Sequence, residues 1–334
     1  MVRRFLAACS VLALVALPQA ASAASTTSNV GGNALQVSPV RTSVTIQPGT
    51  SQTVDVYIQN LTAAPATLSA VIDDFTAGNN ENGEPNILLD GQEAPTHSLK
   101  QFVAPVGDLT LAAHAQKDVK VTITIPKATA GGGYYGVVRF EPAANSSDKN
   151  VNLSASVGSL VLVKVPGAVT EKMSLASLDV RKFDTHNQTD GSPSTLFTSN
   201  KNLDAVVRFQ NQGNVQLAPF GKLVLKRGGK QIALYEVNNA SEPGNVLPGS
   251  IRRFAIRLNG IGSIGKYTLE GNFGYGTKGQ LLTASKTFYI IPVAAIVVAV
   301  VAVIALIALV FGFPKLLHAY NRRVIRRANQ GKRT

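Results

Sequence analysis

Residues 53–59 read TVDVYIQ, and apolar side chains alternate strictly with polar ones along this stretch. Because successive side chains of a β-strand point to opposite faces, the pattern predicts a strand with one face buried. The same alternation recurs in residues 119–125, 136–140, 159–165 and 205–209. Pro-Gly, Asn-Gly and Gly-Gly pairs separate these stretches, as turns do in β-sandwiches. The exported part of the chain is therefore predicted to be all-β.

The two halves of this β-rich region echo each other. The matched pieces are VYIQN, ending at Asn60, with VRFQN, ending at Asn211; residues 133–138 with residues 265–269; and Pro48-Gly49 with Pro248-Gly249. A Gly-x-Tyr step at the start of a late strand is typical of immunoglobulin-like sandwiches, in which a tyrosine hydroxyl caps the corner between strands. The pieces follow a different order in each half, which indicates related architecture rather than a duplicated segment.

We therefore expect two tandem immunoglobulin-like β-sandwich domains, at residues 25–166 and 167–288, followed by a single transmembrane helix. Each domain contains a polar insertion, at residues 73–98 in the first and 184–202 in the second. Sandwiches bind through loops on a rigid frame, so both insertions are candidate binding loops, although a plain solvated excursion fits them equally well.

Residues 290–313 contain no charged, amide or hydroxyl side chain. A helix of this length crosses a bilayer core of about 30 Å at about 1.5 Å per residue. The following tail, residues 314–334, carries seven Lys and Arg residues and no acid. Such a basic flank favours the cytoplasmic side, so the tail is expected to be cytoplasmic.

The N-terminus fits the same topology. Arg3 and Arg4 precede an apolar run, and small residues at Ala21 and Ala23 predict a signal peptide that comprises residues 1–23. Lipidation of Cys9 is a weaker alternative, because the apolar run continues past it. The chain is thus expected to be a single-pass type I protein of a bacterial cell membrane with its N-terminal domains outside the cell.

The formal net charge of +13 at first suggests a nucleic-acid binder. Two of the 32 basic residues leave with the signal peptide and seven lie in the tail, so 23 remain against 19 acidic residues. Most of the excess positive charge thus lies in the two end segments that set the orientation in the membrane, and no nucleic-acid partner is expected. Cys9 is the one cysteine, so the mature chain lacks disulfides, thiolate catalysis and cysteine-ligated metal.

Residues that could carry catalysis are scattered. Carboxylates in the first insertion could serve glycoside hydrolysis or bind calcium, but the adjacent Asp73 and Asp74 would point to opposite faces of a strand. The segment also lacks the spacing of a calcium loop. The four histidines are dispersed, and no nucleophile or phosphate-loop motif is present. We expect no catalytic residue, metal site or cofactor, and hence no enzyme.

Tyr134, Tyr135 and Arg139 are the candidate binding residues, because tyrosine and arginine are frequent in interaction hot spots. Alternation places the two tyrosines on opposite faces of their strand, so one of them is expected in the core.

The order of signal, two sandwiches, span and basic tail resembles the WxL-interacting-protein-like family of bacterial membrane-anchored surface proteins. The residues that carry this resemblance are the strand entry from Pro48 to Thr53 with Asn60 to Thr62, the GGGYYGVVRF strand at 131–140, FQNQGN at 209–214, and PGS at 248–250. The resemblance implies a first domain that binds peptidoglycan and a second that binds a surface protein. None of that family's ligand contacts can be matched to a position here.

These observations favour a non-enzymatic adhesion or scaffold protein whose exported domains bind another surface protein or cell-wall glycan. An alternative is an accessory subunit of a membrane complex that docks through its span or basic tail. A glycan hydrolase is a weaker hypothesis, since it requires two carboxylates about 5–10 Å apart in one cleft.

Overall fold

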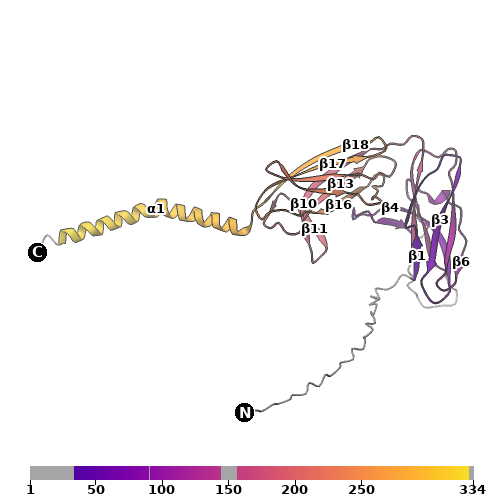
Figure 1. Ribbon diagram of the computed structural model, residues 1–334, viewed down its shortest axis with the longest axis horizontal. Coiled ribbons are helices and arrows are strands. Elements are labelled where there is room, and N and C mark those ends of the chain that lie inside the picture. Colours follow the sequence, from indigo (N-terminus) through magenta and orange to yellow (C-terminus); the bar gives the residue numbers. More distant parts are fainter. Residues whose placement is uncertain (1–33, 90, 144–155, 331–334) are drawn as a thin grey trace, which may run out of the picture.

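The computed structural model describes residues 34–89, 91–143 and 156–330 and consists of two β-sandwiches and a C-terminal helix. Figure 1 shows them in line, with the second sandwich between the helix and the first sandwich. The fold class predicted from the alternating segments is confirmed. The expected signal peptide, residues 1–23, lies outside the described residues.

The first sandwich pairs a small sheet with a larger one. The small sheet has the strand order β1-β3-β7, and the larger sheet has the order β2-β9-β8-β4-β5, with β6 also paired to β4. The strands are β1 (Leu35–Ser38), β2 (Arg41–Thr45), β3 (Ser51–Asn60), β4 (Ala66–Ala77), β5 (Pro85–Leu88), β6 (Leu109–Leu111), β7 (Gln116–Thr124), β8 (Gly132–Pro142) and β9 (Val157–Val165), with a short 3-10 helix, η1 (Lys100–Phe102), before β6.

The second sandwich pairs sheets of order β11-β10-β13-β16 and β12-β18-β17-β14-β15. Its strands are β10 (Met173–Asp184), β11 (Thr189–Ser194), β12 (Leu196–Phe197), β13 (Leu203–Asn211), β14 (Phe220–Arg227), β15 (Lys230–Val237), β16 (Ile251–Arg257), β17 (Gly265–Tyr275) and β18 (Gln280–Ile290). Both polar insertions thus contain strands, since β4 continues to Ala77 and β11 and β12 lie within 184–202.

The two sandwiches share one topology. In each, a central strand, β3 or β13, pairs antiparallel with a strand on either side. In each, a short strand, β2 or β12, pairs parallel with the last strand of its domain, β9 or β18. The last strand then pairs with its preceding strand, β8 or β17. Related architecture, as expected from the echoing segments, is therefore observed.

Two of the three sequence echoes correspond structurally. Asn60 ends β3 and Asn211 ends β13, which are equivalent strands. The Gly-x-Tyr steps begin β8 and β17, but the register aligns Gly132-x-Tyr134 with Gly265-x-Tyr267, one residue earlier than the match of residue 133 with residue 265 read from the sequence. The Tyr134 hydroxyl donates to the Ala130 carbonyl at 2.9 Å, while the Tyr267 hydroxyl accepts from the Gly262 amide at 2.9 Å. The tyrosine corner is thus confirmed.

The third echo is coincidental. Pro48-Gly49 precedes β3, whereas Pro248-Gly249 precedes β16, the equivalent of β7. The two dipeptides serve turns at different points of the shared topology, because any tight turn can use the backbone freedom of glycine.

Each sandwich is held by its own apolar core. In β3 the inward side chains of Val54, Val56 and Ile58 are buried and the alternating side chains are not. The second core is rich in aromatic rings, and Phe209, Phe273 and Phe288 are fully buried in it. Burial of such cores is the main favourable term in the stability of two domains of this size.

The chain leaves the second sandwich through helix α1 (Val293–Gln330). Residues 293–323 are long and apolar enough to cross a membrane, and none of the most apolar part of this segment is buried against the sandwiches. Ile290, expected as the first residue of the span, is the last residue of β18, and α1 continues through Pro314 into the basic tail.

Candidate functional site: the cleft between the two domains

A hairpin of the first domain reaches across to the second domain (Figure 1). The first part of β4 pairs with β8, and its last residues continue beyond β8 to pair with β5. Side chains of the turn hold its shape, since Asn82 accepts a hydrogen bond from the Glu84 amide at 2.9 Å and Asn80 donates to the Glu84 carboxylate at 2.7 Å. The turn therefore presents Glu81 to the second domain in a fixed position.

Glu81 makes both side-chain and main-chain contacts with the second domain. Its carboxylate accepts hydrogen bonds from Arg208 Nε at 2.7 Å and Nη2 at 2.5 Å, and its carbonyl accepts one from the Arg253 amide at 2.7 Å. Arg208 and Arg253 are register partners on β13 and β16, so their like charges lie side by side. Glu81 supplies the opposite charge, and the hydrogen bond from Arg208 holds the pKa of Glu81 below its ordinary value.

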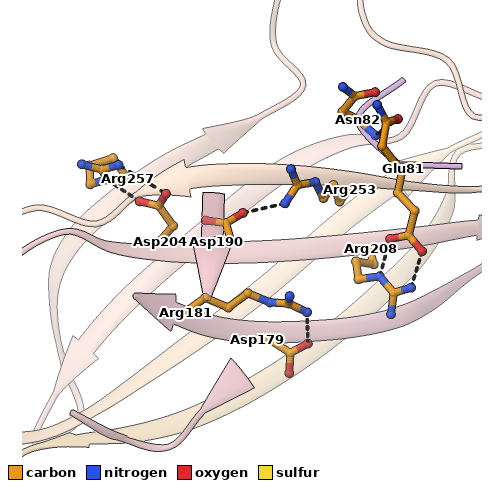
Figure 2. A network of polar contacts seen from close by, with 10 residues as sticks. Glu81, Asn82, Asp179, Arg181, Asp190, Asp204, Arg208, Arg253 and Arg257 are labelled. Atoms are coloured by element: carbon orange, nitrogen blue, oxygen red, sulfur yellow. Dashed lines mark hydrogen bonds and ion pairs between the residues drawn. The ribbon is translucent and has the colours of Figure 1, made fainter. Parts of the chain in front are cut away.

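Figure 2 shows that Glu81 joins a row of ion pairs on the β10-β13-β16 sheet. The other pairs in this row are Arg253 with Asp190 at 2.7 Å, Arg181 with Asp179 at 3.7 Å, and Arg257 with Asp204. Asp190 is almost fully buried, and burial raises the pKa of its carboxyl group. Because the charges in this row are largely neutralised in pairs, we assign it a structural role.

A second contact joins the domains near the linker. The amide of Gly133 donates to the Asn214 carbonyl at 2.8 Å, and the Asn214 side-chain amide donates to the Gly131 carbonyl at 2.9 Å. The hydroxyl of Tyr135 donates to Gln216 Oε1 at 3.0 Å. With the hairpin contact, these bonds attach the domains at two separate places and so restrict their relative motion.

A cleft with a solvent-accessible volume of about 70 Å³ lies beside the hairpin, where the two domains meet. Apolar and charged side chains from both domains line it. The residues from the first domain are Arg41, Phe75, Ala77, Gly78, Glu81, Gly83, Glu84, Pro85, Leu160 and Leu162, and those from the second are Asn245, Leu247, Ser250, Ile251 and Arg252.

Arg252 is the distinctive polar residue of this cleft. Its Nη1 donates to the Asn245 carbonyl at 2.9 Å, and its guanidinium carbon lies 5.3 Å from the Phe254 ring centroid. Its Nε is buried and has no hydrogen-bond partner. Burial, and then the charge of Arg41, lowers the pKa of the guanidinium. Gly83 packs against this group so closely that an added Cβ would lie 2.1 Å from its central carbon.

Arg41 brings a second positive charge to the cleft. Its side chain is mostly buried, and it forms an ion pair at 3.5 Å with Glu242, whose side chain is 70% exposed. Such a long, solvent-exposed pair contributes little. No ion pair to Arg252 is present within the part of the chain that the structure describes. The two arginines can therefore accept an anionic group, with apolar side chains beside it.

The carboxylates at this cleft are poorly suited to glycoside hydrolysis. Arg208 lowers the pKa of Glu81, and hydrogen bonds from Asn82 and Asn80 lower that of Glu84. A general acid at neutral pH needs a raised pKa, whereas both groups are held in the ionised form.

Asp73 and Asp74 point to opposite faces and hold the fold. Asp73 accepts a hydrogen bond from Arg139 Nε at 2.9 Å. Both oxygens of Asp74 accept backbone amide bonds, from Leu99 and Lys100 on one oxygen and from Ala94 on the other. Both side chains are buried. Asp74 therefore anchors the loop that follows β5, Asp73 is paired with Arg139 on β8, and neither carboxylate lines the cleft.

The three candidate binding residues have different surroundings. Tyr135 is 3% exposed and lies at the interdomain contact, so it is the tyrosine that the alternation placed in the core. Tyr134 is half-buried against Phe102, and Arg139 pairs with Asp73 and Glu141. The structure does not bring Tyr134 and Arg139 into the cleft, and their role in binding stays a prediction.

Sequence reasoning missed Arg41 and Arg252 as possible site residues, and it considered Glu81 only among the carboxylates of the first insertion. One signal was available, because alternation places Arg252 on the same face of its strand as Phe254 and Ile256, which pack on the core. A charged residue at such a position needs a special environment. Nothing comparable marks Arg41, and the sequence does not indicate that Glu81 contacts the other domain.

Metal ligands do not gather in the described parts of the chain, where no group of three His, Cys, Asp or Glu side chains could hold an ion. His97 hydrogen bonds to the Gly133 carbonyl through Nδ1 at 2.6 Å, which gives this histidine a structural partner.

No family model and no curated protein matches this chain. Solved structures with some likeness include the class 5 fimbriae chaperone CfaA, with 14% identity, 77% of this chain and 99% of that chain covered, and a TM-score of 0.36. The YadV chaperone is 12% identical, with 76% of this chain and 100% of that chain covered and a TM-score of 0.33. The E. coli chaperone DraB is 14% identical, with 77% of this chain and 96% of that chain covered and a TM-score of 0.32.

These values are too low to support a family or a function. The three similar structures are chaperones and not WxL-interacting proteins. The fold itself supports the resemblance read from the sequence only at the coarse level of two immunoglobulin-like sandwiches.

Proposed function

We propose that this chain is a membrane-anchored, non-enzymatic binding protein whose interdomain cleft binds a carboxylate group of another surface protein. The observation that carries the proposal is the partly buried, incompletely paired guanidinium of Arg252, beside Arg41 in an apolar cleft. A buried arginine without a carboxylate partner costs stability, and a bound anion would offset that cost.

The size and lining of the cleft favour a peptide ligand. A volume of about 70 Å³ accommodates a carboxylate and a small apolar group but is too small for an extended sugar chain. Leu160, Leu162, Leu247 and Ile251 would contact the apolar part, while the guanidinium groups would bind the carboxylate. A chain terminus that ends in an aliphatic residue has this chemistry. Cell-wall glycan is the competing ligand.

The proposed location follows from the two ends of the chain. A cleaved signal peptide would export the sandwiches, and the basic end of α1 would remain in the cytoplasm. The cleft would then face the space outside a bacterial membrane, in a type I arrangement. The double attachment between the domains would keep the cleft in one shape while the span fixes it at the membrane.

The test uses the full chain in lipid nanodiscs and two synthetic peptides that end in valine, one with a free carboxyl terminus and one amidated. We expect the free carboxylate to bind at least about tenfold more tightly, which corresponds to one charge-assisted hydrogen-bond pair. Arg252→Met keeps the apolar stem and should abolish this difference. The control Lys117→Met removes an exposed charge on β7 and should preserve it.

Calorimetry gives the affinities, and captured membrane and cell-wall fractions give the natural partner. Equal affinity for the two peptides, or a preference that survives Arg252→Met, would contradict the carboxylate site. Capture of purified peptidoglycan by the wild-type and Lys117→Met proteins, but not by Arg252→Met, would replace the protein partner with glycan.

A further inference from the structure

The second domain is joined to α1 with almost no free linker. The amide of Ile291 still donates to the Phe197 carbonyl at 2.9 Å, which extends the pairing of β18 with β12. Helix α1 begins at Val293, and the Pro292 carbonyl already accepts a hydrogen bond from the Ala295 amide at 2.9 Å. Because no flexible linker separates them, the position of the first helical turn fixes the position of this end of the sandwich.

The length of the span sets that position relative to a bilayer. Residues 293–313 form 21 apolar residues of α1, which as a helix measure about 31 Å and match a hydrocarbon core of about 30 Å. The headgroup layer on each side is about 5–7 Å thick, or about two residues of an extended strand. Ile291 then lies in the outer part of that layer, and Tyr289, two residues earlier in the strand, lies just outside it.

Exposed apolar side chains gather at this same end of the domain. Ile264 is 50% exposed, and it precedes Gly265, the register partner of Ile290, so it lies level with Ile291. Leu196 is 52% exposed and Tyr289 is 42% exposed, and they are register partners on β12 and β18. Exposed apolar groups that cluster beside a membrane span favour contact with lipid over contact with water.

Basic side chains surround these apolar residues. Lys266 is the register partner of Tyr289 on β17, and Lys201 lies in the loop before β13. Arg227 donates to the Ile264 carbonyl at 3.0 Å, and Lys230 follows in the same hairpin. The carboxylate of Asp184, at the β10–β11 turn, is occupied by the amides of His186 and Asn187. This end is therefore suited to anionic lipid phosphates.

We propose that this end of the second domain, comprising Leu196, Lys201, Ile264, Lys266, Tyr289 and Ile291, is a membrane-contact surface. Ile264 and Ile291 enter the headgroup layer, Tyr289 lies just outside it, and the lysines bind lipid phosphates. The surface holds the domain upright on the bilayer. The inference depends on the membrane span but not on the cleft or its ligand.

The experiment places single spin labels on the full chain in nanodiscs of phosphatidylcholine and phosphatidylglycerol at a ratio of 3 to 1. Cys9→Ser provides a cysteine-free background, to which Ile264→Cys, Leu281→Cys or Val303→Cys is added. Leu281 is the matched control, because it is 68% exposed and is the second residue of β18, the strand whose other end lies beside Ile264. The relative accessibility of each label to oxygen and to a nickel chelate reports its depth.

We expect the oxygen-to-nickel ratio at position 264 to be at least about threefold higher than at 281 and lower than at 303. Adding Lys201→Glu and Lys266→Glu should lower the ratio at 264, whereas Lys222→Glu on the same sheet should not. Equal ratios at 264 and 281 would contradict the membrane-contact surface and leave the membrane span unaffected. An aqueous value at 303 would overturn both.

Discussion

Two buried asparagines, Asn60 and Asn211, form equivalent hydrogen bonds in the two domains. The side-chain amide of Asn60 donates to the carbonyls of Ala64 and Ala112, and that of Asn211 donates to the carbonyls of Val215 and Val246. Both side chains are fully buried. Each closes the turn after its own strand and ties it to the segment that leads into the neighbouring strand. The shared QN ending of the two echoing segments therefore has a physical cause.

Replacement of Asn211 tests this role. Asn211→Ala leaves the carbonyls of Val215 and Val246 and the Gly213 amide without their partner, and we expect the free energy of unfolding to fall by about 2–4 kcal/mol. Denaturant titration followed by tyrosine fluorescence measures it. Asn272→Ala, at an exposed site on β17, should change stability by less than about 0.5 kcal/mol. A comparable loss for both variants would refute the special role of Asn211.

At the scale of elements, the β4–β5 hairpin connects the two domains by hydrogen bonds and an ion pair. Its tip reaches β16, which is the edge strand of its sheet, and occupies one of the free amides of that edge. Glu81 has a φ of 58°, a strained value for a residue with a side chain. The bidentate bond to Arg208 and the main-chain bond to Arg253 offset this strain.

The Glu81–Arg208 pair predicts a pH-dependent contribution to stability. Because the pKa of Glu81 in the folded state lies below its ordinary 4.5, the pair stabilises the fold fully above about pH 4.5 and loses its effect as the pH falls through the lowered value. Glu81→Gln should cost about 1 kcal/mol at pH 7, after allowance for solvent screening.

Denaturation midpoints between pH 7 and pH 3 measure this effect. The difference between wild type and Glu81→Gln should shrink towards the acidic end of the range. Glu93→Gln, a change at an exposed carboxylate, is the control and should show no such trend. A gap that grows as the pH falls would show that the sign of the Glu81 contribution is wrong.

At the scale of the whole molecule, two interdomain contacts and a short junction to α1 form one rigid connection from α1 to the first domain. The hairpin contact joins residues 127 apart in sequence, and the Asn214 contact joins residues 83 apart. Two attachment points oppose both bending and twisting, whereas one would permit rotation. The cleft beside the hairpin therefore keeps its shape without help from a ligand.

A distance measurement between the domains tests this rigidity. Spin labels at Lys117→Cys in the first domain and Lys222→Cys in the second, on the Cys9→Ser background, should give a single narrow distance distribution. Adding Glu81→Gln and Asn214→Ala should at least double its width, because both attachments are then weakened. A width that stays unchanged in this variant, measured by pulsed electron resonance, would contradict the two-contact model.

The alternating segments by themselves determined the strands and the two-sandwich class, because both depend on which face of a local segment is apolar. The uninterrupted apolar run at residues 290–313 predicted a helix long enough to cross a membrane, because length and composition are local properties too. Strand β3, for example, was predicted at residues 53–59 and observed at Ser51–Asn60. The tyrosine corner was also readable, since its hydrogen bonds reach only a few residues along the chain.

Only the tertiary structure decided which residues form the cleft and the junction. Periodicity specifies how far a side chain is buried but not which distant strand it meets, so the meeting of Glu81 with Arg208, and of Arg41 with Arg252 in one cleft, could not be read from the sequence. The partners of Tyr135 and Arg139 could not be read from the sequence for the same reason, since Tyr135 bonds Gln216 of the second domain and Arg139 pairs with Asp73. Local pattern fixes the elements, whereas long-range electrostatics and packing fix the site.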